Sequence, residues 1–235
     1  LLAERHYDVL HLNAYQGLSL TYLELARKMG VPIRIAHSHN TALRISPTKP
    51  LKLLIHNWAK IRYTKQATAL WACAEPAAEF LFSEKELDKR GYIFIQNGID
   101  TERFKFAPEV RNIMRTELQL EEKFVIGNVG RLCFQKNQEF LLEVFREVVN
   151  REPGSVLLLI GEGKDKEKLK RKAEQWGLHE KVVFYGATDQ IERLYWAMDV
   201  FIMPSRFEGL PVTGVEAQAS GVPCLFSDAI TEECR

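Results

Sequence analysis

Short apolar runs alternate along this chain with longer stretches in which apolar residues recur at helical spacing. The runs typical of strands are 8–13, 32–38, 69–74, 92–96, 124–130, 155–160, 181–185, 200–203 and 222–226. The stretches typical of helices are 19–29, 50–65, 76–82, 137–151, 165–176, 189–198 and the segment that contains Glu216. Strict alternation of this kind predicts right-handed crossovers and parallel sheets, so we expect an α/β fold.

Two successive arrays of such segments predict two domains, each with its own parallel sheet. The stretch after Asp100 is polar and carries no strand pattern, which favours a boundary there. We expect a first domain over residues 1–104 and a second over 105–235, with a linker at 105–122. Basic residues outnumber acidic ones over the first 108 residues and the reverse holds afterwards, although the net charge is only +1. The two domains are therefore expected to bind different partners.

The composition is that of a globular protein, with 46% hydrophobic and 27% charged residues. No apolar run approaches the roughly 20 residues of a membrane span, and no signal segment opens the sequence. The four cysteines lack the C-x-x-C spacing of zinc and redox sites, which predicts a reducing compartment without disulfides. We expect a cytoplasmic protein without a structural metal.

The stretch 205–221 carries the most chemistry. The strand-like run before it ends at Pro204, a glycine-containing turn follows, and Pro211 stands where a helix can begin. Peptide N–H groups from Gly209 onward would then suit a phosphate or another anion. Glu208 in the turn and Glu216 in the helix add acceptors for hydroxyl groups, and a sugar nucleotide offers both kinds of partner. The alternative is that both carboxylates are solvated surface charges.

A second candidate region follows the run 124–130 directly. It reads R-L-C-F-Q-K-N and contributes the cations of Arg131 and Lys136. A strand, a glycine, a basic loop and a helix in this order place both cations at the carboxyl end of a sheet. Open α/β sheets bind ligands at that edge. The alternative is two solvated loop cations.

Three motifs taken together identify a family resemblance. They are G-R-L-x-x-x-K-N from Gly130, N-G-I-D from Asn97, and E-G-L-P-x-x-x-x-E-A from Glu208. In this order they resemble the retaining, nucleotide-sugar-dependent glycosyltransferases of the group 1 / family 4 type, whose two Rossmann-like domains form the GT-B fold. Measured against that family, the chain is expected to be a fragment. The opening strands of the first domain, its Gly-rich loop and the closing C-terminal elements would be missing.

The resemblance also implies roles for individual residues. Arg131 and Lys136 would stabilise the leaving diphosphate without a metal ion, which agrees with the absence of a D-x-D motif. Glu216 would bind the ribose hydroxyls and Glu208 the hydroxyls of the transferred sugar. Backbone N–H groups at Gly209 and Leu210 would complete the sugar-phosphate pocket.

Further candidates come from the ends of other strands. Gly161 and Gly163 would let the backbone approach the ribose or base, or they simply form a tight turn. The segment 184–186 could flank the base, although packing is the alternative that we favour. From the first domain, His37 would contact the sugar or acceptor, with His39 as second choice. The alternative is a histidine on the surface or satisfied by loop carbonyls, and no nearby carboxylate or cysteine supports a metal site.

A basic amphipathic helix is expected between Arg44 and Lys65. This stretch contains no acidic residue and its basic residues are Arg44, Lys49, Lys52, Lys60, Arg62 and Lys65. Apolar residues recur at helical spacing between them. Such a helix can lie on an anionic membrane surface, which would be the inner face for a cytoplasmic protein. The alternative is that its apolar face covers the sheet, and both can hold if the basic residues face outward.

The preferred interpretation is a retaining, metal-independent hexosyltransferase of bacterial surface polysaccharide (exopolysaccharide) biosynthesis. It would use a UDP-sugar or a similar donor and a glycan or lipid-linked acceptor, with no cofactor and no nucleic-acid partner. One alternative is an inactive nucleotide-binding module. Another is a glycoside hydrolase, which also uses two carboxylates but has no use for Arg131 and Lys136.

Overall fold

The computed structural model describes residues 6–43, 49–230 and 234, and these form two units. The first unit extends to Asn97 and also includes Glu208–Leu210, whereas the second contains Gly98–Phe207 and Pro211–Ile230. Each unit has one sheet in which every strand pairing is parallel. The predicted α/β class with two parallel sheets is confirmed. The first unit ends a few residues earlier than the predicted boundary after residue 104.

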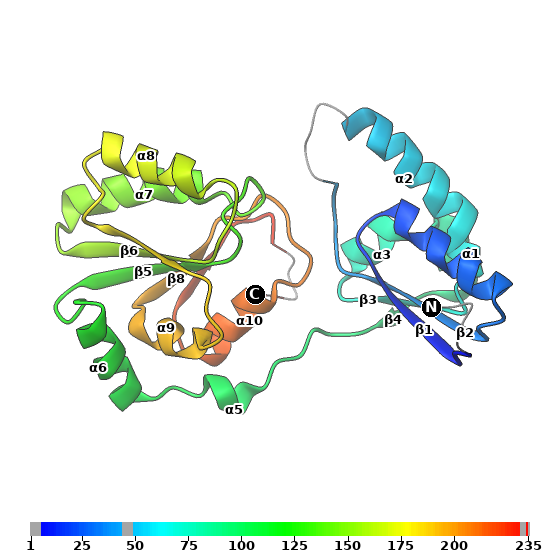
Figure 1. The fold of residues 1–235 in the computed structure, drawn as a ribbon, viewed down its shortest axis with the longest axis horizontal. Coiled ribbons are helices and arrows are strands. Elements are labelled where there is room, and N and C mark those ends of the chain that lie inside the picture. The colour runs from blue at the N-terminus through cyan, green and yellow to red at the C-terminus, as the bar shows by residue number, and fades with distance from the viewer. Residues whose placement is uncertain (1–5, 44–48, 231–233, 235) are drawn as a thin grey trace. The chain divides into compact units, whose positions relative to one another are not determined.

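The first unit contains a four-stranded sheet in the order β1-β2-β3-β4. Its strands are β1 (Val9–Ala14), β2 (Ile33–Ser38), β3 (Ala69–Ala72) and β4 (Ile93–Phe94). Its helices are η1 (Gly17–Leu20), α1 (Thr21–Lys28), α2 (Lys49–Tyr63), η2 (Thr64–Gln66), α3 (Glu75–Leu81) and α4 (Glu84–Arg90). Figure 1 shows α1 and α2 on the same side of the strands. Small buried side chains such as Ala36 and Ala72 line the core with Leu20, Leu23 and Leu81.

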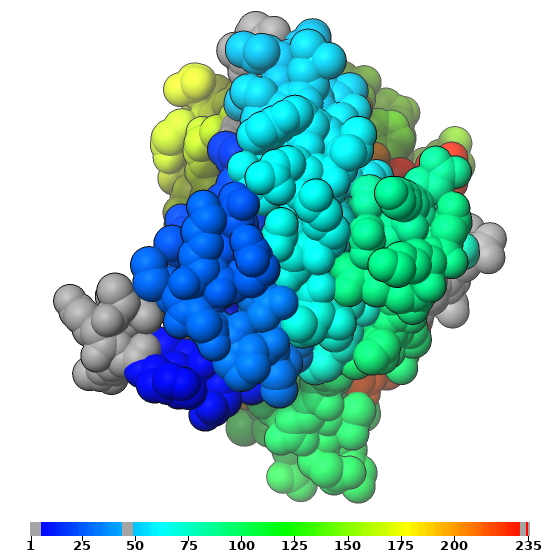
Figure 2. All heavy atoms as spheres, turned by 90° about the vertical axis from the view of Figure 1, so that its right-hand side faces the viewer, coloured from blue at the N-terminus to red at the C-terminus, as the bar shows by residue number. Residues whose placement is uncertain are grey.

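Helix α2 does not pack as the alternative interpretation expects. Only His56 and Ala59 are buried along it, whereas Leu54, Trp58 and Ile61 are 69%, 55% and 71% exposed. Figure 2 shows α2, coloured cyan, forming part of the molecular surface. The idea that its apolar face covers the sheet is therefore wrong. Arg44, at the start of the predicted basic stretch, lies outside the described residues.

A polar anchor explains this orientation of α2. The N–H of Gly17 donates to Nδ1 of His56, and Nε2 of the same ring donates to the carbonyl oxygen of Phe80, each over 2.9 Å. A Cβ added at Gly17 would lie 2.3 Å from the His56 carbonyl oxygen, so only glycine permits this approach. Because His56 and Ala59 share one helix face, the Leu/Trp/Ile side chains turn to the surface.

The second unit contains a five-stranded sheet in the order β7-β6-β5-β8-β9. Its strands are β5 (Phe124–Val129), β6 (Ser155–Ile160), β7 (Val182–Gly186), β8 (Val200–Met203) and β9 (Cys224–Phe226). Its helices are α5 (Thr101–Phe104), α6 (Pro108–Glu117), α7 (Gln138–Arg151), α8 (Lys166–Gln175), α9 (Ile191–Ala197) and α10 (Val212–Ala219). In Figure 1, α7 and α8 cover one face of this sheet, and α6, α9 and α10 lie on the other.

The strand order of the second sheet reverses between β5 and β8. From β5 the chain proceeds to β6 and β7 on one side, and then returns to form β8 and β9 on the other. A crevice opens outside the carboxyl ends of the strands at such a reversal, and open α/β sheets bind ligands there. The loops after β5 and after β8 are the two that carry the predicted site residues.

The predicted linker at 105–122 is largely helical. Helix α6 occupies most of it and belongs to the second unit. Its side chains Arg111 and Arg115 pair with Asp199, at N–O distances of 2.6 and 3.1 Å. Arg115 also donates to the carbonyl oxygen of Ala197. The polar composition that favoured a linker therefore comes partly from residues that attach α6 to the sheet.

Candidate functional site

The loop after β5 approaches the loop after β6 at backbone distance. A Cβ at Gly161 would lie 2.2 Å from the carbonyl oxygen of Gly130, and one at Gly163 would lie 2.2 Å from that of Leu132. The Gly130 N–H donates to the Ile160 carbonyl oxygen, and the Leu132 N–H to that of Glu162. Both glycines of the G-E-G segment are thus required by contact with the neighbouring loop. Their predicted approach to a ribose or base stays a prediction.

A buried amide network beneath this loop holds Arg131 in place. Gln138 is 2% exposed, and its Nε2 donates to Oδ1 of Asn128 and to the carbonyl oxygen of Arg131. Its Oε1 accepts from the N–H of Cys133. Sequence reasoning missed both amides. The signal was present, because Asn128 is a polar residue inside an otherwise apolar strand.

Hydrogen bonds join the cationic loop to the loop after β8. Gln135 Nε2 donates to the carbonyl oxygen of Phe207 over 3.1 Å, and the N–H of Arg206 donates back to the Gln135 carbonyl over 2.8 Å. Asn137 Nδ2 donates to the carbonyl oxygen of Pro204 over 3.1 Å. The two motif regions, far apart in sequence, therefore meet at the strand-order reversal.

Both predicted cations lie on this loop. The Arg131 side chain is exposed, and Lys136 is half-buried with its methylene carbons against Gly130. Two cations beside a helix-initiating loop form an environment suited to a phosphate group.

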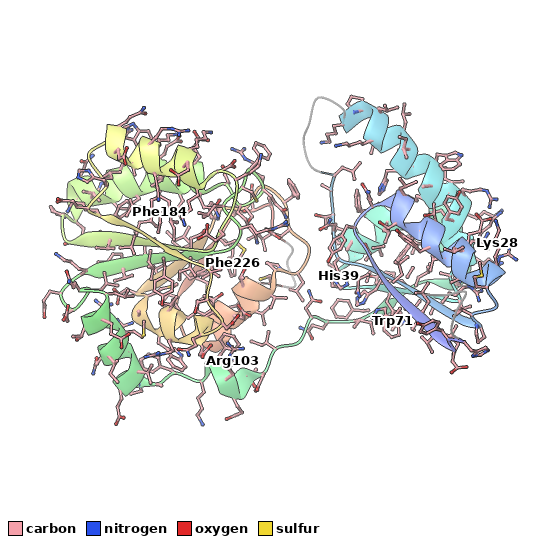
Figure 3. All side chains as sticks on the ribbon, viewed as in Figure 1. Lys28, His39, Trp71, Arg103, Phe184 and Phe226 are labelled. Carbon is pink, nitrogen blue, oxygen red and sulfur yellow. The ribbon has the colours of Figure 1, made fainter. Side chains whose placement is uncertain are left out.

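Glu216 lies on α10, which begins after Pro211. Its Oε2 is 3.0 Å from the hydroxyl of Tyr195, and burial raises the pKa of the carboxyl above its ordinary value. The hydrogen bond from Tyr195 and the charge of Arg103 act in the opposite direction on that pKa, while Glu192 adds to the increase. Arg103, labelled in Figure 3, lies on α5 and pairs with Glu192 at 2.8 Å.

Glu208, Gly209 and Leu210 group with the first unit. Their predicted contacts with the transferred sugar stay predictions. The expected helix after Pro211 is confirmed, although α10 begins at Val212 and the predicted anion-binding N–H groups precede it.

At the end of β7, one aromatic side chain packs against the core and the next is exposed. Phe184, labelled in Figure 3, packs against the core formed by α7, α8 and β6, as the favoured alternative predicted. Tyr185 is 40% exposed. Gly186 has a φ of +91°, and its carbonyl oxygen accepts from the N–H of Gly161.

In the first unit, His37 is the penultimate residue of β2 and lies inside an aromatic cluster. It is 5% exposed, and its ring stacks on that of His11 at 5.3 Å with Nδ1 3.1 Å from His11 Nε2. Trp71 meets His37 edge-on, and His39 lies 4.0 Å away between ring centroids. Burial, followed by His39 and His11, lowers the pKa of His37 to about 4. His37 is therefore buried, which contradicts the surface-histidine alternative, and it is neutral at pH 7.

Within residues 6–43, 49–230 and 234, no group of three or more His, Cys, Asp or Glu side chains is placed to hold a metal ion. No helix in these ranges is both long and apolar enough to cross a bilayer.

The fold and the site define an α/β protein with two parallel-sheet units and a basic loop at the strand-order reversal of the second sheet. Residues 110–233 match the family described as Glycosyl transferases group 1, and residues 1–103 match Glycosyltransferase Family 4. The chain belongs to the group 1 glycosyltransferase family, and the resemblance inferred from its motifs is confirmed.

Curated relatives extend beyond this chain. The putative glycosyltransferase EpsF of Bacillus subtilis is 34% identical over 94% of the chain and 58% of its own length. The UDP-Gal:alpha-D-GlcNAc-diphosphoundecaprenol alpha-1,3-galactosyltransferase of Escherichia coli is 30% identical over 100% of the chain and 61% of its own length. The chain thus spans about three fifths of these relatives.

Solved structures confirm the GT-B fold. Anabaena HepE, in complex with UDP and glucose, aligns with a TM-score of 0.78 at 22% identity, covering 95% of this chain and 60% of its own. WaaG, a glycosyltransferase involved in lipopolysaccharide biosynthesis, aligns with a TM-score of 0.63 at 16% identity, covering 89% and 63% respectively.

Proposed function

We propose that this chain is the donor-binding part of a retaining, metal-independent glycosyltransferase of cell-surface polysaccharide biosynthesis. It takes a UDP-sugar and serves a glycan or lipid-linked acceptor. The observation that carries this proposal is the hydrogen-bonded junction of the Arg131–Asn137 loop with the loop after β8, at the strand-order reversal. Family membership favours transfer over glycoside hydrolysis. The UDP complexes of HepE and the UDP-Gal in the name of the Escherichia coli relative support a UDP-sugar donor.

The chemistry that this arrangement serves is departure of the nucleoside diphosphate. As the bond to the sugar breaks, negative charge grows on the diphosphate, and fixed cations lower the energy of that state. The guanidinium of Arg131 offers bidentate contact and Lys136 a point charge, so this charge is stabilised without a metal ion. Glu216 accepts from the ribose hydroxyls and Glu208 from those of the sugar.

His37 is assigned to the same reaction as a neutral hydrogen-bonding group. Its low pKa keeps it uncharged at pH 7. A neutral ring contacts a sugar or acceptor hydroxyl without opposing the positive charge that develops on the transferred sugar.

A binding-only module is the second candidate function. It is favoured by one fact, which is that the chain spans about three fifths of its curated relatives. Under this alternative the chain binds UDP but transfers sugar only as part of a longer protein. Assays of transfer by this chain and by a longer form that contains it separate the two candidates.

The proposal also includes docking of the first unit on an anionic membrane surface, where a lipid-linked acceptor would be found. Helix α2 exposes Leu51, Leu54, Trp58 and Ile61 on the basic first unit. Exposed apolar side chains flanked by lysines and arginines suit the interface of an anionic bilayer. A protein docked on the inner face of the membrane would meet a lipid-linked acceptor there.

Binding of UDP and of uridine to the same variants tests the diphosphate assignment. Arg131→Ala and Lys136→Ala should each weaken UDP about tenfold or more, because each loses a charge-assisted contact, and should leave uridine unchanged. In a longer, active form each should cost about 2–4 kcal/mol of transition-state stabilisation.

Matched controls accompany this test. Lys170→Ala and Arg171→Ala on α8 remove equal charge from an exposed helix of the same unit, and should change neither affinity. Melting temperatures of the Arg131 and Lys136 variants should stay near that of the parent. If UDP affinity is unchanged in both loop variants, the diphosphate does not bind at this loop.

A further inference from the structure

Tyr195 carries a buried hydroxyl group that the proposed function does not use. It lies on α9 and is 0% exposed. Its ring meets those of Phe104 and Phe201 edge-on, at centroid distances of 6.1 and 5.7 Å. These contacts from two sides fix the ring, so its hydroxyl occupies a defined place.

That hydroxyl has two acceptors within reach and one proton to give. It lies 3.0 Å from Glu216 Oε2 and 3.0 Å from the carbonyl oxygen of Thr213, one turn earlier on α10. Burial, together with the Glu216 charge, raises the pKa of Tyr195, so it remains a donor throughout the neutral range. The ionised carboxylate is the stronger acceptor of the two.

We propose that Tyr195 is a positioning residue: its hydroxyl donates to Oε2 of Glu216 and thereby directs the remaining carboxylate oxygen at the ribose diol of the bound nucleotide. The inference rests on the proposed binding of UDP. The carboxylate is on a helix and its side chain has three rotatable bonds, so a second contact is needed to hold one orientation. Tyr195 supplies that contact from a neighbouring helix.

The charged groups around Glu216 complete the environment. Arg103 and Glu192, paired with each other at 2.8 Å, act on the carboxylate with opposite signs. Tyr195 reaches Glu216 by a hydrogen bond. Removal of the hydroxyl therefore changes both the orientation of the carboxylate and its affinity for a proton.

The experiment measures UDP and 2′,3′-dideoxy-UDP binding by calorimetry, with this chain and three variants. The variants are Tyr195→Phe, Glu216→Gln and the double variant. The parent should prefer UDP, because only UDP offers the diol. Tyr195→Phe should weaken UDP about tenfold and 2′,3′-dideoxy-UDP less than twofold. Glu216→Gln should weaken UDP, and adding Tyr195→Phe to it should cost little more, because the two residues act as one unit.

The outcomes separate this inference from the proposed function. If the parent fails to bind UDP, the proposed function is wrong. If it binds both ligands equally well, UDP binding stands, but the ribose diol does not contribute to affinity and the positioning role falls. Equal weakening of both ligands by Tyr195→Phe, or full additivity with Glu216→Gln, shows that Tyr195 is merely structural. Tyr92→Phe in the first unit serves as the matched control.

The pH dependence provides a readout that a structural role would not change. UDP affinity should fall as pH drops through the raised pKa of Glu216, because the protonated carboxyl accepts poorly. Without the Tyr195 donor the charged form is less favoured, so the midpoint should move to higher pH in Tyr195→Phe. If that variant does not fold, 3-fluorotyrosine at position 195 keeps the hydroxyl and makes it a stronger donor. The midpoint should then move to lower pH, and an unchanged midpoint overturns the proposal.

Discussion

At the scale of single residues, His37 illustrates how burial selects one chemical form of a side chain. The ring lies between His11, His39 and Trp71, and two of these neighbours are themselves titratable. Burial and the mutual repulsion of protonated rings keep His37 neutral until about pH 4. A neutral ring with one donor and one acceptor is suited to sugar hydroxyls, which both donate and accept.

This low pKa makes stability depend on pH. Unfolded His37 titrates near 6.5 and folded His37 near 4, so between these values the unfolded chain binds more protons. The free energy of unfolding should therefore fall as pH drops from 6.5 to 4. In His37→Gln this loss should be smaller, by up to about 3 kcal/mol at pH 4. Urea unfolding at several pH values measures it, and exposed His6→Gln is the control. Equal slopes in the parent and His37→Gln would contradict the assignment.

The sequence identified the candidate ligand-binding residues within the motifs, but not the residues that fix their positions by hydrogen bonds. Arg131, Lys136 and Glu216 could be placed at the sheet edge because glycines, strand ends and spacing mark that edge locally. Tyr195 was missed because its partners come from another helix. Gln138 was missed although the polar Asn128, inside an otherwise apolar strand, marked its partner. No spacing in the sequence predicts a hydrogen bond between α9 and α10.

At the scale of elements, helix α2 shows where periodicity reaches its limit. The pattern predicted an amphipathic helix over 50–65, and the helix is found at Lys49–Tyr63. It could not predict which face is buried, because the contact face is set by a histidine and an alanine rather than by the large apolar residues. Helices α4 to α6 were missed for a related reason. They are short or strongly polar.

The exposed face of α2 should bind anionic vesicles. Two replacements should each reduce binding to phosphatidylglycerol-containing vesicles at least several-fold. One removes apolar residues of α2 (Leu54→Ser with Ile61→Ser), and the other reverses cations on α2 and the following η2 (Lys52→Glu with Lys65→Glu). Lys60 is left unchanged because its ammonium group donates to the carbonyl oxygen of Glu79. Vesicle co-sedimentation measures binding. Added salt should weaken the parent's binding, because exposed charges are screened within about 8–10 Å at 0.1–0.15 M.

Two controls separate the effect of net charge from that of the exposed apolar side chains of α2. Lys170→Glu with Arg171→Glu makes the same charge change on α8 in the other unit and should leave vesicle binding intact. Trp58, which is 55% exposed, reports insertion directly, since its emission should shift to the blue on vesicles. If the parent does not sediment with anionic vesicles at low salt, the membrane proposal fails.

Asp199, just before β8, forms ion pairs with two arginines of α6. Asp199 accepts from Arg111, Arg115 and the N–H of Val125, and although burial alone would raise its pKa, these partners hold it below its ordinary value. Asp199→Asn should cost about 3 kcal/mol, because it leaves a buried arginine without its counter-charge. The parent keeps this stabilisation above about pH 4 and loses it as pH falls through the lowered pKa, whereas the variant should lack it at every pH. Urea unfolding of both, with exposed Asp228→Asn as control, checks this prediction.

At the scale of the whole molecule, the residues with proposed roles belong to two different units. The groups assigned to the diphosphate and ribose belong to the second unit, whereas Glu208–Leu210, assigned to the sugar, group with the first. This division could be predicted only in part, because the sequence placed the E-G-L-P segment in the second domain.

Hydrogen exchange with UDP and with a UDP-sugar tests this division. UDP should protect amides of the loop after β5 and of α10, because a ligand at 100 times its Kd stabilises the unit that binds it by about 2.7 kcal/mol. Strands β1 to β4 should exchange as in the free protein. A UDP-sugar that fits should extend protection to Glu208–Leu210, since only that ligand offers hydroxyls to Glu208. In Glu216→Gln, at fixed ligand concentration, protection by UDP should decrease. If UDP alone slows exchange in β1 to β4 as much as in α10, the nucleotide binds the first unit too, and the assignment of its contacts to the second unit is wrong.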